Sequence, residues 1–369
     1  MPKSGRIAGI CLCLVLGACS LPRGAALQSE VLRNQHSADA GFAHYQIDRA
    51  LLPEIAAWPR NGKSPERQWI RASSGAAGQI IAPGDTVAIS VWENGGNALL
   101  TAPGTHSTTL QPSTVSPEGN VFVPYVGSIK ISGMSPEHAR ETIQTRLEPL
   151  IAAVQVQLAV QPGRQNAVDI VSGVARPGSY PMADRAMTVL GLISLGGGVA
   201  PGIENPQVRL LRGARGYAIS MERLLNEPDL DTLLRAGDKL VVEKDPRYFM
   251  ALGASGREEM VPFRRETVSA LEAVTIAGGI SDARANPQGV LILREYPQSA
   301  LQSAAQPGPS HSRVVFSMDL TSADGLFSAG NFSLESGDLV LATESPAVSA
   351  RTILALLGAG VGVGNALDN

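Results

Sequence analysis

The residue types that most often carry out catalysis or bind metals are scattered in this chain. No two of its five histidines lie three or four residues apart, the spacing that helical metal-binding motifs require. The adjacent Glu258 and Glu259 are the best pair of acids for hydrolysis of a glycosidic bond, which needs carboxyl groups about 5 to 9.5 Å apart across that bond. Adjacent acids in a polar turn are usually solvated, so the sequence predicts neither a metal site nor this activity.

Nucleophilic and phosphate-binding motifs do not match either. Gly253-Ala254-Ser255-Gly256 has the wrong spacing for a nucleophile elbow. The glycine runs at 196–198 and 358–364 are not followed by Lys and Ser or Thr, as a phosphate-binding loop requires. We therefore expect a protein that is not an enzyme, with no catalytic residue, no metal and no cofactor.

Cys19 is the one residue placed for covalent chemistry. It directly follows Leu-Gly-Ala at 16–18, which ends an apolar stretch over residues 7–16 that two basic residues precede. These features are typical of a secretory signal peptide, and a cysteine at this point resembles the lipobox of bacterial lipoproteins, in which the thiol is acylated. We expect residues 1–18 to be removed and Cys19 to carry lipid, and Ser20 after it favours the outer membrane. The alternative is a secreted protein with a chance cysteine.

Cysteine usage and charge narrow the possibilities further. The other two cysteines, Cys11 and Cys13, lie in the predicted signal peptide, so no disulfide can form in the mature chain although its compartment is oxidising. The net charge is −3 and becomes more negative when the basic signal is removed, which argues against nucleic acid as a partner. A mature chain of about 350 residues favours two or three domains.

The first folded block extends over residues 79–160. Val87, Ile89 and Val91 alternate as a half-buried strand does after the turn at Pro83-Gly84-Asp85, and we interpret this Gly-Asp as turn chemistry rather than a ligand site. Strands are also predicted near 121–126, 129–131 and 154–160. Ser135-Pro136-Glu137 predicts a helix start, with Ala139, Ile143 and Leu147 on its buried face. Before this block, a strand over 42–47 and a helix over 49–58 are predicted.

The rest of the chain repeats itself. Residues from Leu190 to Val199 match residues from Leu271 to Ile280 at an offset of 81, whereas Gly237-Asp238 matches Gly337-Asp338 at a larger offset. The difference indicates an insertion in the second copy, most simply the loop over 297–312. A period this long indicates two tandem domains rather than a solenoid, each with a helix that ends at a Gly-Gly turn.

The C-terminal segment is apolar. Residues 349–367 contain one charged side chain, Arg351, and one helix of this length would extend about 28 Å, near the thickness of a bilayer core. Its glycines lower helix propensity but allow close packing of helices in lipid, and it lacks an aromatic belt. The alternatives are a helix docked on the preceding domain and a frayed tail. The candidate membrane-spanning residues lie within 352–363 and are Thr352, Ile353, Leu354, Leu356, Leu357, Val361 and Val363.

Together, the Cys19 motif, the block with Pro83-Gly84-Asp85, Glu118-Gly119-Asn120 and Ser135-Pro136-Glu137, and the two Gly-Gly repeats resemble the bacterial outer-membrane polysaccharide exporters, the Wza-type auxiliary lipoproteins. The resemblance implies an α+β fold, with a polysaccharide export domain followed by two tandem β-grasp-like repeats and a C-terminal helix. The expected boundaries are 1–18 for the signal peptide, 19–78 for a lipid-anchored tether and N-terminal segment, 79–165 for the export domain, 166–246 and 247–345 for the repeats, and 346–369 for the membrane helix.

The resemblance also implies a function. The chain would form a homo-oligomer, an octamer in that family, that stands on its lipid anchors with most of its mass in the periplasm. Its C-terminal helices would cross the outer membrane, and the pore would export capsular polysaccharide or exopolysaccharide delivered by an inner-membrane polysaccharide co-polymerase. Two rivals are a monomeric, lipid-anchored periplasmic oligosaccharide-binding protein and a periplasmic carbohydrate-active enzyme; the missing catalytic motif counts against the enzyme.

Overall fold

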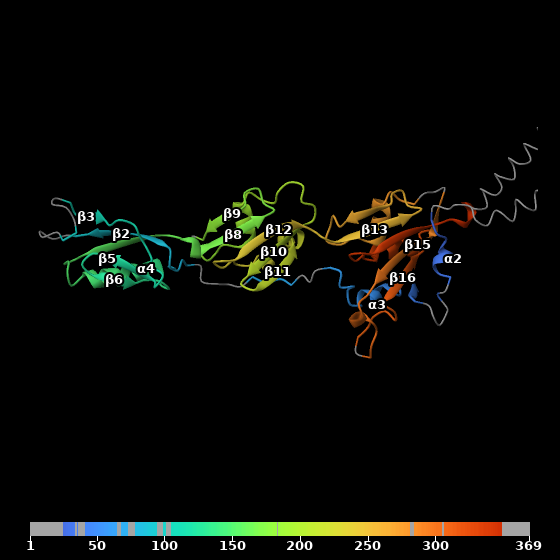
Figure 1. Cartoon of the computed structure of the whole chain (residues 1–369), viewed down its shortest axis with the longest axis horizontal. Helices are drawn as coiled ribbons and strands as arrows, with labels where there is room; N and C mark the ends of the chain where they lie inside the picture. The colour runs from blue at the N-terminus through green and yellow to red at the C-terminus, as the bar shows by residue number, and fades with distance from the viewer. Residues whose placement is uncertain are drawn as a thin grey trace, which may run out of the picture. The chain divides into compact units, whose positions relative to one another are not determined.

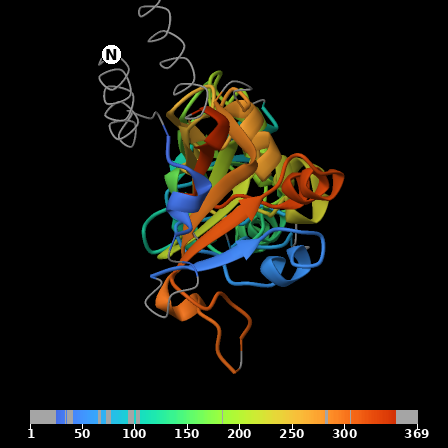
Figure 2. The ribbon, with the colours of Figure 1, turned by 90° about the vertical axis from the view of Figure 1, so that its right-hand side faces the viewer.

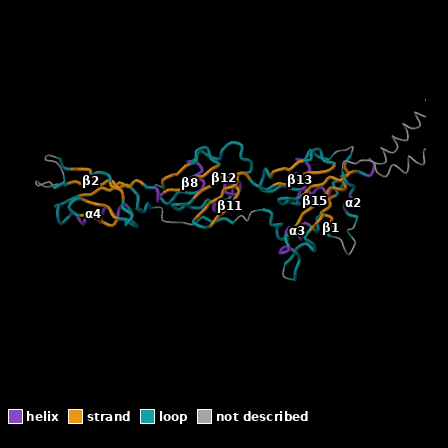
Figure 3. Tube along the Cα trace, in the orientation of Figure 1, coloured by secondary structure: helices purple, strands orange, loops and turns teal. Residues whose placement is uncertain are grey.

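The computed structural model divides the chain into two compact units (Figures 1 and 3). One combines described residues up to 64 with those from 246 onward, and the other extends from 68 to 245. The fold is α+β, with strands and helices in both units. The described residues are 25–33, 35, 41–64, 68–72, 78–93, 99–100, 105–182, 184–280, 284–304 and 306–348.

The first folded block of the 68–245 unit, the predicted export domain, is built around β2 (Thr86–Trp92). This strand pairs antiparallel with β3 (Ser107–Thr109), β4 (Ser113–Thr114) and β7 (Gln155–Gln161). β5 (Asn120–Val123) and β6 (Gly127–Lys130) form a separate hairpin. The predicted alternation in the first strand is confirmed, since Val87, Ile89 and Val91 are all buried.

Helix α4 (Pro136–Leu147) covers this domain's core, and its start and buried face are those predicted. The hydroxyl of Ser135 accepts a hydrogen bond from the His138 N–H at 3.2 Å, which satisfies one of the free donors of the first turn. Ala139, Ile143 and Leu147 are completely buried among the sheet residues.

The two repeats share one topology, as the internal repeat predicts. In the first, the strand order is β11-β10-β12-β8-β9, and in the second it is β16-β15-β17-β13-β14; the first and last strands of each copy pair in parallel. The first copy contains β8 (Ala167–Ser172), β9 (Gly178–Pro181), α5 (Val189–Leu195), β10 (Pro206–Arg212), β11 (Arg215–Ser220), α6 (Met221–Asn226) and β12 (Lys239–Lys244). The second contains β13 (Tyr248–Gly253), β14 (Glu259–Pro262), α7 (Ala270–Ile276), β15 (Ala285–Glu295), β16 (Arg313–Met318), α8 (Ala323–Asn331) and β17 (Leu339–Glu344).

One glycine in each repeat is required by the close approach of two strands. Gly173 and Gly253 have φ angles of +79° and +91°, which residues with a side chain rarely adopt. A Cβ on Gly173 would lie 1.8 Å from the carbonyl oxygen of Val242, and one on Gly253 would lie 2.3 Å from that of Ala342. In each repeat, a glycine at the end of the first strand therefore allows the backbone to pass close to the last strand.

The N-terminal segment completes the sheet of the second repeat. β1 (Ala43–Gln46) pairs in parallel with β16 and lies along it in Figure 2, so this sheet has six strands. α2 (Gln28–Val31) and α3 (Leu52–Ala56) flank β1 in the chain. Leu32 packs on Leu291 and Val315 on one face of the sheet, while Trp58 joins the core on the other. The predicted strand and helix are confirmed, but their pairing with the second repeat could not be predicted from the sequence.

Candidate functional site

The two predicted membrane-linked sites, Cys19 and residues 352–363, lie outside the described residues. The structure does describe the residues that follow Cys19, from Ala25 on, and those that precede 352, up to Val348. These two flanking segments contact each other. The Glu344 N–H, at the end of β17, donates a hydrogen bond to the carbonyl oxygen of Ala26 at 3.0 Å. Leu27 forms a parallel bridge with Glu344, and Ala25 packs against the small cluster that contains Ala342.

Chain length limits how far each predicted membrane site can lie from this contact. Cys19 precedes Ala26 by seven residues and Thr352 follows Glu344 by eight, so neither can be farther away than about 25 to 30 Å. In the part of the chain that the structure describes, no helix has both the length and the apolar character needed to cross a membrane.

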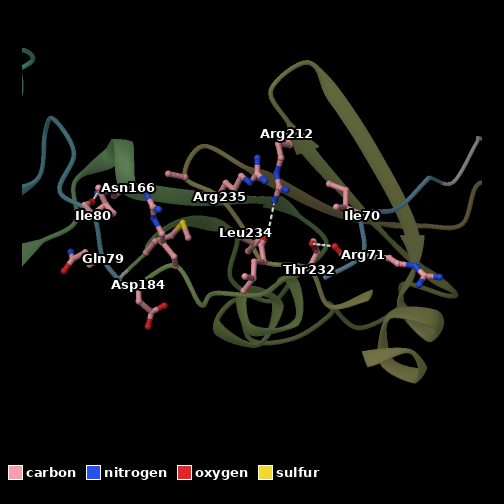
Figure 4. A pocket seen from close by; sticks show the side chains of 14 residues that line it. Ile70, Arg71, Gln79, Ile80, Asn166, Asp184, Arg212, Thr232, Leu234 and Arg235 are labelled. Atoms are coloured by element: carbon pink, nitrogen blue, oxygen red, sulfur yellow. Dashed lines mark hydrogen bonds between the residues drawn. The ribbon is translucent and has the colours of Figure 1, made fainter. Parts of the chain in front are cut away.

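A pocket of about 650 Å³ opens in the 68–245 unit (Figure 4). This volume is within the usual range for sites that bind small molecules. Gln79 and Asp184 lie at one end of the pocket in the figure, and Arg71 lies at the other. Its lining residues are Ile70, Arg71, Gln79, Ile80, Asn166, Met182, Asp184, Arg185, Arg212, Thr232, Leu233, Leu234, Arg235 and Ala236.

Two buried aspartates fix the positions of residues that line this pocket. Asp85 accepts hydrogen bonds from the Gly163 N–H at 2.7 Å and from the Asn166 side-chain amide at 2.8 Å, which fixes the chain where the export domain leads into the first repeat. Asp238 pairs with the guanidinium of Arg212, whose Nη2 lies 2.6 Å from a carboxylate oxygen. Arg212 is thereby oriented, and most of its charge is compensated.

The three Gly-Asp motifs confirm the interpretation as turn chemistry. In each, the aspartate accepts a hydrogen bond of 2.8 Å from the backbone N–H of the residue three positions earlier. All three side chains are buried, and they are Asp85, Asp238 and Asp338. Because their oxygens are used within the fold, they stabilise turns rather than bind a ligand.

The remaining charges of the pocket are mostly positive. Arg185 and Arg235 are exposed, and neither has an ion-pair partner among the described residues. Arg71 is 84% exposed, and its closest carboxylate oxygen, on Asp229, is 3.9 Å away, a pair worth little in water. Asp184 is the one acid in the lining, and its carboxylate also accepts the Ala186 N–H at 2.9 Å.

The second repeat has a smaller pocket, of about 280 Å³, beside Arg247, Glu266, Arg294 and Glu335. Arg294 is completely buried, with its Nη2 2.7 Å from Asp338 and its Nη1 3.2 Å from Glu335. Burial opposes its charged form, but the two carboxylates outweigh burial and raise the pKa of Arg294 above its ordinary value. Burial also raises the pKa of Glu335.

Sequence reasoning did not find either pocket. The arginines that line the first are far apart in the chain, from Arg71 to Arg235, and no spacing rule connects them. The signal that was available is the internal repeat, because it aligns Arg185 with Glu266 and Arg235 with Glu335.

Comparison with known proteins identifies the first domain. Residues 74–161 match the family model described as polysaccharide biosynthesis/export protein. They contain the Gly-Asp turn, the β5–β6 hairpin and α4. This part of the chain is therefore a polysaccharide export domain.

Similarity to export proteins continues along the chain. It is 29% identical to the capsule polysaccharide export protein BexD of Haemophilus influenzae, over 91% of each chain. It is 28% identical to the capsule polysaccharide export outer membrane protein CtrA of Neisseria meningitidis serogroup B, over 78% of this chain and 77% of the relative. It is 27% identical to the EPS I polysaccharide export outer membrane protein EpsA of Ralstonia nicotianae, over 75% and 74%.

The matched domain and these relatives support the predicted family, the Wza-type outer-membrane polysaccharide export proteins. The names of the family and of the relatives are those of export proteins rather than enzymes. Two of the three relatives are named outer membrane proteins, which supports the predicted location of this chain.

Proposed function

We propose that this chain is a lipoprotein of the outer membrane that assembles into an oligomeric pore, and that the pore exports capsular polysaccharide or exopolysaccharide to the cell surface. The relatives' names support polysaccharide as the cargo. In this proposal Cys19 carries the lipid, residues 352–363 cross the membrane, and the ring is an octamer that receives polymer from an inner-membrane co-polymerase.

The observation that carries the proposal is the contact between the two flanks of the chain. The Ala26–Glu344 hydrogen bond and the Leu27–Glu344 bridge hold together the segments that lead to the lipid site and to the C-terminal segment. A lipid anchor and a membrane helix must reach the same bilayer, and each is within about 30 Å of this contact. The second repeat therefore faces the membrane in the proposed assembly.

Transport by such a pore requires no covalent step. A bilayer core tolerates only segments whose backbone hydrogen bonds are satisfied internally, and an α-helix in each subunit meets that requirement. The small residues among 352–363 suit close packing between neighbouring helices. The passage between the subunits would remain hydrated, and polymer would move through it without modification.

The test is electron microscopy of the full-length lipidated protein in detergent, beside a variant that ends at Pro346. We expect closed rings with a central passage and density that the shorter variant lacks. Export is measured in parallel as surface polysaccharide in a deletion strain complemented with each variant. Cys19→Ala should abolish membrane anchoring, whereas Cys19→Ala protein that still incorporates a palmitate analogue would contradict the lipid site.

A monomeric, lipid-anchored oligosaccharide-binding protein is the second candidate, and the 650 Å³ pocket favours it. This alternative predicts dispersed single particles for both proteins under the microscope. It also predicts that the C-terminal truncation leaves function unchanged. Rings from the full-length protein would exclude it.

A further inference from the structure

The pockets of the two repeats occupy the same place on the fold. The Met182 N–H bonds to the Asn166 carbonyl at 2.8 Å, and the Phe263 N–H bonds to that of Arg247 at 3.0 Å. Likewise, the Leu234 N–H bonds to the Met187 carbonyl and the Leu334 N–H to that of Val268, both at 2.8 Å. These matched bonds align Arg185 with Glu266 and Arg235 with Glu335.

In the second repeat, the charges of this place are satisfied from within. The carboxylate of Glu266 lies 3.7 Å from the guanidinium of Arg247, and Glu335 lies 3.2 Å from that of Arg294. The N-terminal segment also binds the turn that carries Glu335. The Asn61 N–H donates to the Glu335 carboxylate, and the Asn61 side-chain amide donates to the Ser336 carbonyl. This pocket is therefore both narrower and neutralised.

In the first repeat, both acids are replaced by arginines. Arg212 corresponds to Arg294 and keeps its aspartate, Asp238. Arg185 and Arg235 therefore add positive charge where the other copy has its own counter-charges, and the pocket is more than twice as large. The turn that carries Arg235 is rigid, since its backbone N–H donates to Asp238 at 2.8 Å.

The chemistry of the lining specifies a class of ligand. Guanidinium groups bind carboxylate and phosphate through charge-assisted, often bidentate hydrogen bonds. In the same lining, Ile70, Ile80 and Leu234 provide apolar surface, and Gln79 and Asn166 provide amides. A sugar unit with an acidic substituent presents the complementary combination of apolar faces, hydroxyls and a negative charge.

We infer that this pocket binds an acidic segment of a saccharide chain, with its anionic groups at Arg185 and Arg235. The inference rests on the proposed function for the saccharide nature of the ligand, whereas the negative charge follows from the pocket itself. The site would make the first repeat selective for acidic over neutral polymer, and the second repeat would lack this selectivity.

The test is calorimetric titration of the full-length protein in detergent with four probes. Trigalacturonate carries carboxylates, glucose 6-phosphate carries a phosphate, maltotriose is neutral, and inorganic phosphate lacks the sugar. We expect binding of one or both acidic sugars at least about tenfold tighter than of maltotriose or inorganic phosphate, since each charged hydrogen bond contributes roughly that factor. The stronger of the two identifies carboxylate or phosphate as the recognised group.

The decisive variant is Arg185→Glu with Arg235→Glu. Both changes replace an arginine by the glutamate that occupies the equivalent position of the second repeat. It should weaken binding of the acidic sugar by about a hundredfold, roughly tenfold for each arginine. The control, Arg209→Glu with Arg215→Glu, makes the same change in net charge outside the pocket and should change affinity less than about twofold at 0.15 M salt, where exposed charges are screened. Thermal melting of each variant checks that the repeat is folded.

Three results would each overturn the inference. They are equal affinity for maltotriose and trigalacturonate, no binding of either acidic sugar, and unchanged binding by the Arg185→Glu, Arg235→Glu variant. Inorganic phosphate binding as tightly as the sugars would show a simple anion site and would also overturn it. The ring and export measurements are independent of these titrations. Rings without sugar binding would reject the pocket alone, and sugar binding without rings would reject the pore alone.

Discussion

Arg294 provides the sharpest test of how the second repeat is held together. It is buried with its side chain 3% exposed, and it bonds to Asp338, Glu335 and the Ser333 carbonyl oxygen. Its guanidinium also lies 5.2 Å from the ring centre of Phe332. The change Arg294→Met keeps much of the apolar stem and removes the charge.

The expected cost follows from what is left behind. The Asp338 side chain is 0% exposed and that of Glu335 is 19% exposed, so both lose their cation without gaining access to water. Removing one partner of a buried ion pair costs about 3 to 5 kcal/mol. For a unit of this size, each kcal/mol lowers the melting temperature by about 2 to 4 °C, which gives a shift of roughly 6 to 20 °C.

The assay is thermal and urea unfolding of the full chain, with the transition of this unit resolved from the other by hydrogen exchange of β15 and β17 amides. Arg209→Met is the matched control, because Arg209 pairs with Glu243 at 3.2 Å but the two side chains are 46% and 40% exposed. Such a surface pair contributes at most about 1 kcal/mol, so the control should be nearly as stable as the parent.

The result should also depend on pH. Burial raises the pKa of Glu335, and Arg294 acts in the opposite direction, so its removal should raise that pKa further. A folded state with the higher carboxyl pKa binds more protons than the unfolded state, and its stability increases as the pH falls. The loss of unfolding free energy in Arg294→Met, relative to the parent, should therefore be smaller at pH 5 than at pH 7. A loss below about 1 kcal/mol, equal to that of Arg209→Met, would refute the reasoning.

Three further changes test other parts of the fold. Asp85→Ala should cost about 2 to 4 kcal/mol, because its buried N–H donors lose their acceptor, and limited proteolysis near residue 163 should speed up; equal cleavage rates would contradict its role. Glu335→Gln should flatten the pH dependence of stability between pH 7 and 4.5, because the parent loses stability as the pH rises through the raised pKa of this carboxyl; unchanged pH profiles would argue against a shifted carboxyl. Gly173→Ala should lower stability by at least about 1 to 2 kcal/mol from its positive φ alone, and the close approach of Val242 should add to this loss. Gly216→Ala, with its nearest neighbour 3.6 Å away, should be close to neutral; similar unfolding midpoints for the two variants would contradict the requirement for glycine at position 173.

Much of the local structure was predictable because its causes are local. The Ser135 cap, the apolar stripe of α4 and the alternation in β2 depend on neighbouring residues, and all three are confirmed. The repeat was also visible, since two copies under the same packing constraints keep glycines and apolar residues at matched positions. Recognition of the family from these motifs is supported by the comparisons.

The partners of distant segments required the tertiary structure. β1 pairs with β16, about 270 residues later, because the edge of that sheet has unpaired backbone groups, and a four-residue strand carries no signal of which edge it will join. The repeat aligns Arg235 with Glu335, two residues before the matched Gly-Asp turns, but only the fold shows that Glu335 pairs with Arg294 whereas Arg235 lines an open pocket. By itself, the sequence determined the lipoprotein motif, the repeat and most elements, since these depend on residues close in the chain. Only the tertiary structure showed that the flanks of the two predicted membrane sites meet, and that one pocket keeps arginines unpaired among the described residues where the arginines of the other are paired with glutamates. Both results depend on contacts between residues far apart in the sequence.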